Sequence, residues 1–165
     1  MPTLTKLIDD GQLVRIEIEL EGALPWRTLL GTPDFVRWLD EELPKLETTI
    51  VGGDLTPEEQ VYAIFYDYVT GAHIQFHTDD RRFKKLNPLN HNVWELKTLD
   101  LRVFGWVLAK DCFICTYGKM KDELELMNSY GRYVALTVGW RNKCGLDKPN
   151  VVTGENYNDV LSDAH

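Results

Sequence analysis

The cations of residues 81–121 are the side chains of this sequence best suited to hold a phosphate or another acidic group. Against Glu95, Asp100 and Asp111, this segment carries Arg81, Arg82, Lys84, Lys85, Lys97, Arg102, Lys110, Lys119 and Lys121. Its net charge is +6, within a chain of 165 residues whose net charge is -8. Such a local field favours a phosphate-bearing or acidic partner, unless the acidic N-terminal half of the protein neutralises it.

Arg102 is the most constrained of these cations. Residues 101–108 (LRVFGWVL) are typical of a strand, and side-chain alternation places Arg102 on the same face as Phe104 and Trp106. A buried arginine needs an anion or a group of carbonyls as its partner. We expect that anion to be Glu95 or Asp100, or else the phosphate of a ligand.

Three successive antiparallel strands, at 93–98, 101–108 and 112–117, are predicted to position these cations. Upstream, residues 13–21 alternate apolar and charged side chains and predict a further strand. Helices are predicted to begin after Thr32 and Thr56, each followed by proline and an acidic residue, and a last helix covers about 122–141.

Length and composition fit a single domain over residues 1–165, with a core at about 13–143. Residues 1–12 are predicted to be a loose start, and 144–165 a polar tail that is either an ordered extension or flexible. No apolar run is long enough to span a membrane, and the start of the chain lacks the apolar core of a secretory signal.

The odd cysteine count indicates a reducing, cytoplasmic setting without a disulfide framework. Cys112 and Cys115 would face opposite sides of a strand, and His73 and His77 have helical metal spacing in a segment that is not helix-like. We therefore expect no metal and no other cofactor.

The order of these elements resembles the RelE/HigB superfamily of toxin ribonucleases, and especially its phage-related HigB-like branch. The residues that carry the resemblance are Phe83–Leu86, Val93–Lys97, Asp100–Phe104 and Tyr117–Lys119. The resemblance covers about residues 33–141. It implies an α+β fold, in which an N-terminal helical hairpin and a C-terminal helix pack on a twisted, mostly antiparallel sheet.

The same resemblance implies a toxin of a toxin–antitoxin system, a metal-independent endoribonuclease that cuts mRNA, often on the ribosome. The ribose 2′-hydroxyl would attack the adjacent phosphate, which requires a base, cations and an acid. By correspondence with the family pattern, the catalytic residues would be Lys97, Arg102, Tyr117 and Lys119. The backbone of the RNA would contact Arg81, Arg82, Lys84, Lys85 and Lys121. An antitoxin protein would be a further partner.

The sequence departs from the family pattern at two functional positions. Met120 stands where RelE-type members often have arginine, and the aromatic acid or base expected early in the last helix has no match near Leu124, with Tyr130 lying later. The family is also usually basic overall. An alternative is a non-enzymatic phage or prophage protein that binds a host protein through acidic surfaces such as Glu17, Glu19 and Glu21. A small-molecule enzyme using His73 or His77 is a third reading.

Overall fold

The computed structural model of the chain describes residues 3–74 and 82–164. The strands are β1 (Val14–Arg15), β2 (Thr28–Gly31), β3 (Phe83–Lys85), β4 (Trp94–Lys97), β5 (Leu101–Ala109) and β6 (Cys112–Met120). The α-helices are α1 (Leu4–Asp9), α2 (Pro33–Arg37), α3 (Pro57–Thr70), α4 (Lys121–Met127), α5 (Tyr130–Lys143) and α6 (Tyr157–Val160). Shorter helical turns are η1 (Trp38–Glu42), η2 (Leu43–Lys45) and η3 (Leu89–His91).

The strands form one six-stranded sheet in the order β1-β2-β6-β5-β4-β3. Every neighbouring pair is antiparallel except β2 and β6, which are parallel. The protein is therefore α+β with a mostly antiparallel sheet, as predicted. The three predicted strands are β4, β5 and β6, and β6 continues to Met120, beyond the predicted end.

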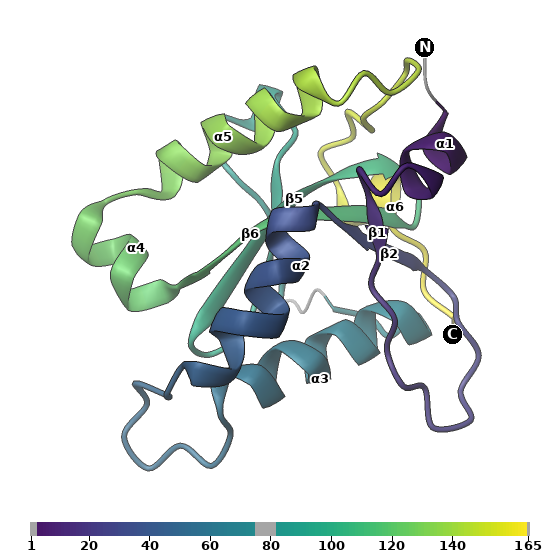
Figure 1. Cartoon of the computed structure of the whole chain (residues 1–165). Coiled ribbons are helices and arrows are strands. Elements are labelled where there is room, and N and C mark those ends of the chain that lie inside the picture. The colour runs from purple at the N-terminus through teal and green to yellow at the C-terminus, as the bar shows by residue number, and fades with distance from the viewer. Residues whose placement is uncertain (1–2, 75–81, 165) are drawn as a thin grey trace.

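Helices cover both faces of the sheet, with α5 on one side and α3 on the other (Figure 1). Successive side chains of β5 point to opposite faces of the sheet and so contribute to the apolar cores on both sides. Leu101 and Val103 pack in a core with Phe65 of α3, whereas Phe104 packs with Val134 of α5. The predicted division of β5 into two apolar faces is confirmed.

The predicted helix starts at Thr32 and Thr56 are both present. The Thr32 hydroxyl accepts a hydrogen bond from the amide of Phe35 at 3.2 Å, and Thr56 forms a capping box with Glu59. Gly71 ends α3 with φ 85°, a left-handed conformation that glycine adopts without strain. After α2 the chain passes through a π-helical turn and then a 3₁₀ turn that contains Pro44.

Two N-terminal predictions were wrong in extent. The predicted strand 13–21 is paired only at Val14 and Arg15, although its side chains alternate in burial as predicted. Beyond the bond from the amide of Ile16 to the carbonyl of Leu29, the chain leaves the sheet, so alternation alone overestimated the strand. The predicted loose start contains α1, capped by Thr3 and anchored through the buried Leu7.

The helix predicted over 122–141 is two helices. Asn128 ends α4 in the left-handed conformation (φ 47°), and α5 begins at Tyr130. As a consequence, Met127 is largely exposed and not part of a continuous apolar stripe. No helix in the described part of the chain combines the length and apolar character needed to cross a lipid bilayer.

The C-terminal segment is ordered and fastened to the sheet. Leu146, Tyr157, Val160 and Leu161 are buried in the core. The fully buried Arg27 side chain donates to the Asp163 carboxylate at 2.7 Å and to the Ser162 carbonyl at 2.9 Å. His73 also contacts Asp163, with its Nδ1 2.7 Å from the carboxylate.

Candidate nucleic-acid interface

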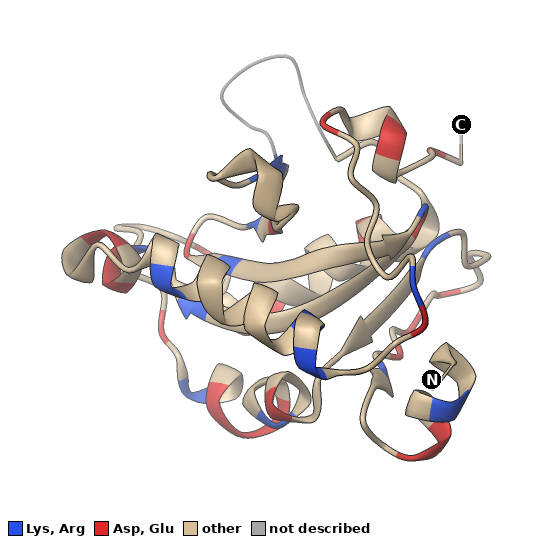
Figure 2. Cartoon of the chain, turned by 90° about the horizontal axis from the view of Figure 1, so that it is seen from above, with Lys and Arg blue, Asp and Glu red and all other residues tan. Residues whose placement is uncertain are grey.

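Strand register brings all three of the predicted catalytic cations into one row. Lys97 of β4 lies opposite Arg102 of β5, and Arg102 lies opposite Lys119 of β6. Directly opposite residues project from the same face of a sheet. The row lies on the α5 side, because Phe104, two residues from Arg102, packs under α5. Figure 2 shows cationic positions on the strands beneath α5 and acidic positions on the neighbouring α4.

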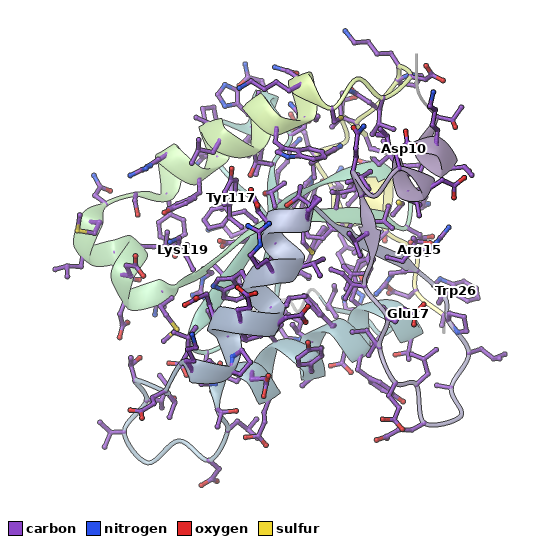
Figure 3. All side chains as sticks on the ribbon, in the orientation of Figure 1. Asp10, Arg15, Glu17, Trp26, Tyr117 and Lys119 are labelled. Atoms are coloured by element: carbon purple, nitrogen blue, oxygen red, sulfur yellow. The ribbon has the colours of Figure 1, made fainter. Side chains whose placement is uncertain are left out.

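Tyr117 and Lys119 lie on this same face and are engaged by α5 (Figure 3). The rings of Tyr117 and Tyr133 are 5.4 Å apart, and the Lys119 ammonium lies 5.2 Å from the Tyr133 ring centre. Burial raises the pKa of Tyr117. Lys119 also lies 3.9 Å from the Glu123 carboxylate. Both predicted residues therefore border the interface, but packing and a weak ion pair already hold them.

The centre of the interface is a hollow of about 470 Å³ between the sheet, α4 and α5. We call it the basic hollow. Its walls carry five cations, two carboxylates and one tyrosine. The residues that line it are Lys84, Lys85, Leu86, Asn87, Glu95, Lys97, Arg102, Lys121, Glu125, Tyr130 and Val134. Its size suits a small ligand such as a nucleotide.

Glu95 is a buried carboxylate in the wall of the basic hollow. It is 3% exposed, and its Oε2 atom has no hydrogen-bond partner among the described residues. Burial raises the pKa of Glu95, while the charges of Arg102, Lys97 and Lys84 oppose the increase. A buried carboxylate with a raised pKa and an unsatisfied oxygen can take up a proton from a bound hydroxyl group.

Arg102 is 7% exposed, and hydrogen bonds to carbonyl groups partly compensate for the burial of its charge. Its Nη1 donates to the carbonyls of Thr98 at 2.6 Å and Leu101 at 2.9 Å. Of the two expected anions, Asp100 is not the partner. Its carboxylate accepts from Gln60 at 2.7 Å and from the Thr49 hydroxyl at 2.9 Å. Glu95 is the carboxylate whose titration Arg102 influences.

Tyr130, at the start of α5, lines the basic hollow together with Glu95, and its hydroxyl is within hydrogen-bonding reach of Arg102. Burial raises the pKa of its hydroxyl, and the Arg102 guanidinium acts in the opposite direction. A tyrosine that keeps its proton beside a cation can donate that proton to a developing oxyanion. The turn at Asn128 positions Tyr130 in the basic hollow. The sequence predicted one unbroken helix here, and that prediction did not indicate this position for Tyr130.

The predicted RNA-binding cations divide into two groups. Lys84 and Lys121 line the basic hollow, and Lys121 lies 3.8 Å from the Glu125 carboxylate. Arg82 and Lys85 have partners within the fold: Arg82 bonds to Asp67 at 2.7 Å, and Lys85, which also lines the basic hollow, bonds to the Gly154 carbonyl at 2.9 Å. Burial lowers the pKa of Lys85. Arg81 and His77 lie outside the described residues.

Glu95 and Tyr130 line the basic hollow but were not among the predicted site residues, although Glu95 was one of the two anions expected beside Arg102. The sequence did contain an indication for Glu95, because it lies two residues before Lys97 on the same strand and therefore on the same face. The described residues contain no group of three or more His, Cys, Asp or Glu side chains that could hold a metal ion.

Fold and site together define an α+β protein with a row of strand-borne cations and a buried carboxyl opposite a tyrosine. Comparison of the chain with family models, with curated proteins and with solved structures gave no match in any of the three.

Proposed function

We propose that this protein is a metal-independent endoribonuclease of the RelE/HigB type, the toxin of a toxin–antitoxin system that cleaves mRNA in the cytoplasm. The observation that carries the proposal is the buried, unpartnered Oε2 of Glu95, set among Lys84, Lys97 and Arg102 and opposite Tyr130. Cleavage by an internal nucleophile needs a base, an anion clamp and an acid, and these residues supply all three.

In the proposed reaction, Glu95 takes the proton of the ribose 2′-hydroxyl as that oxygen bonds to the adjacent phosphorus. Arg102, Lys97 and Lys84 stabilise the negative charge of the five-coordinate phosphorane. The bond from phosphorus to the 5′-oxygen then breaks, and Tyr130 gives its proton to this leaving oxygen. The products are a 2′,3′-cyclic phosphate and a 5′-hydroxyl end. Tyr130 is thus the acid of this proposal, whereas the tyrosine that the family resemblance gave as catalytic was Tyr117.

Part of the acidic charge of the chain lies away from the basic hollow and does not oppose this proposal. Glu17 is well separated from Tyr117 and Lys119 in Figure 3. Glu17, Glu19 and Glu21 border a different hollow beside α3. A charge more than about 10 Å away is largely screened at physiological salt.

The test is cleavage of an end-labelled RNA oligonucleotide, with and without ribosomes and with a metal chelator present. We expect cyclic-phosphate products from the wild type, and none from an oligonucleotide with 2′-deoxy sugars. Glu95→Gln and Arg102→Met should each lower the rate at least about a hundredfold. Glu47→Gln and Arg37→Met, which alter exposed residues away from the hollow, should match the wild type.

Expression in a bacterial host gives the corresponding test in cells. Growth arrest with mRNA cleavage is expected for the wild type and should be lost when Lys97, Arg102 and Lys119 are all replaced by alanine. Intact RNA in every assay with folded wild-type protein would refute the proposal.

A second candidate function is non-enzymatic binding of a basic host protein, as expected of a phage or prophage interaction protein. The observation that favours it is the hollow of about 550 Å³ in which Glu17, Glu19 and Glu21 face Tyr62 and Tyr66 of α3. Affinity capture with the wild type and with all three glutamates changed to glutamine tests it. A basic protein retained only by the wild type, together with uncut RNA, would favour this candidate.

A further inference from the structure

A second hollow adjoins the basic hollow and shares its cations. It has a volume of about 440 Å³, and Lys97, Arg102 and Lys121 line both hollows. Its remaining walls come from α3, from Leu55 and Arg82, and from the turn between β4 and β5, where the amide of Thr98 donates to the carbonyl of Leu101. We call it the turn hollow. A ligand that occupies both hollows must cross the three shared cations.

The walls of the two hollows differ in chemistry. The basic hollow presents Glu95 and Tyr130, whereas the turn hollow presents the apolar side chains of Leu55, Ile64 and Leu99. Leu99 is 65% exposed and Leu55 is 47% exposed, although both are large and apolar. Gln60 also lines the turn hollow, but its amide is already bonded to Asp100 through both its nitrogen and its oxygen. Arg82 lines the turn hollow as well, and Asp67 holds its guanidinium at 2.7 Å. The turn hollow therefore offers a base apolar contact more than hydrogen-bond readout.

From this arrangement we propose that the turn hollow binds the nucleobase on the 3′ side of the scissile phosphate of a single-stranded RNA. The inference rests on the proposed function, which fixes the polarity of the strand. The ribose whose 2′-hydroxyl gives its proton to Glu95 lies in the basic hollow. The phosphate then lies on Lys97, Arg102 and Lys121, and the nucleoside carrying the leaving 5′-oxygen follows into the turn hollow.

The charge distribution identifies the occupant as a nucleic-acid strand. A row of cations between an acid–base site and an apolar hollow matches an anionic backbone link with a flat apolar base on one side. Apolar contact with a base tolerates any base identity, so weak sequence preference is expected at this position. A duplex cannot place one base in each hollow, so the substrate is unpaired at the cleavage point.

Two mononucleotides test the assignment without cleavage. Titration of isotope-labelled protein with adenosine 5′-monophosphate should shift the amide signals of Thr98, Leu99 and Ala63, around the turn hollow. Adenosine 3′-monophosphate should instead shift those of Glu95 and Tyr130. Leu99→Ala should weaken binding of the 5′-nucleotide about tenfold and leave the 3′-nucleotide unchanged. Leu24→Ala is the matched control, because Leu24 is 83% exposed and lines neither hollow.

The result separates this inference from the proposed function. If RNA is cleaved but the 5′-nucleotide shifts only the signals of the basic hollow, or none, the inference is overturned and the ribonuclease proposal stands. If each nucleotide occupies its expected hollow but RNA is never cleaved, the ribonuclease proposal fails and the two-part binding cleft stands.

Discussion

Glu95 and Arg102 lie on adjacent strands and on one face of the sheet, yet the guanidinium does not satisfy the carboxylate. Arg102 bonds to the carbonyls of Thr98 and Leu101, and the Oε2 atom of Glu95 has no hydrogen-bond partner among the described residues. The pKa of Glu95 is raised by burial in spite of the nearby positive charge. An ionised carboxylate that is buried with an oxygen lacking a hydrogen-bond partner lowers the stability of the fold. Functional sites commonly contain such destabilising groups.

Glu95→Gln is therefore expected to stabilise the fold at neutral pH. A carboxyl whose folded pKa is raised contributes stability that is present below its unfolded pKa and lost as pH rises through the folded pKa. Thermal unfolding should give a higher Tm for Glu95→Gln near neutral pH and no difference in acid, while Glu47→Gln stays at the wild-type Tm throughout. A lower Tm at neutral pH would identify a structural ion pair with Arg102.

The pH dependence of RNA cleavage should be bell-shaped. The rate rises as Glu95 loses its proton, with a midpoint above the ordinary value of 4.5 because burial raises the pKa. It falls only when Tyr130 ionises, above the ordinary value of 10.0. Tyr130→Phe should lower the rate about a hundredfold and abolish the alkaline limb. Tyr62→Phe, on α3, serves as the matched control. An alkaline limb that survives in Tyr130→Phe would assign the acid to another group.

Removing an acidic side chain at α4 should strengthen nucleotide binding. Glu125 lies 3.8 Å from Lys121 and lines the basic hollow, so it competes with phosphate for that cation. Glu125→Gln is expected to lower the Kd for a mononucleotide about twofold to threefold at low salt, and the difference should fade as salt is added. Glu42→Gln breaks a similar exposed contact with Lys45 and should leave the Kd unchanged. Weaker binding by Glu125→Gln would show that Glu125 contacts the ligand.

Loss of the Asp163 carboxylate should destabilise the whole protein. Arg27 is fully buried, and Asp163→Asn would leave it without its closest anion, at a cost of about 2 kcal/mol in the free energy of unfolding. Denaturant unfolding measures this loss. The control Asp34→Asn alters an exposed ion pair with Arg37 and should cost no more than about 0.5 kcal/mol.

Low pH should remove the stabilisation by the Asp163 carboxylate from the wild-type protein. Burial alone would raise the pKa of Asp163, but hydrogen bonds from Tyr157 and His73 and the Arg27 charge lower it. The stability from Asp163 is therefore present above its unfolded pKa and lost as pH falls through the lowered folded pKa. The gap between wild type and Asp163→Asn should close in that window. A gap that persists below it would contradict this assignment.

The cation row could be predicted because it depends on local rules. The short turn between β4 and β5 sets their register, and the two-residue period of strands then places Lys97 and Arg102 on one face. The same rule gave the burial alternation of residues 13–21. It did not give the end of β1, because the pairing there depends on where the antiparallel partner β2 begins and not on the pattern itself.

Tyr130 and the C-terminal segment could not be predicted, for two different reasons. The apolar spacing over 122–141 is compatible with one helix, and the left-handed turn at Asn128 has no strong local signal such as glycine. The polar composition of 144–165 gave no sign of its buried contacts. Its contact with Arg27 joins positions 135 and 136 residues apart, a separation that local propensity does not register.

The parallel pairing of β2 with β6, together with the Arg27 contacts, has a consequence for synthesis of the protein. Strand β2 leaves the ribosome long before β6, its partner in the sheet. The partners of Arg27, Ser162 and Asp163, are synthesised later still. Contacts between such distant positions close late and make folding slow. A nascent chain interrupted before β6 has neither Lys119 nor the strand that joins β2 to β5, so the row of Lys97, Arg102 and Lys119 is complete only after β6 has been synthesised.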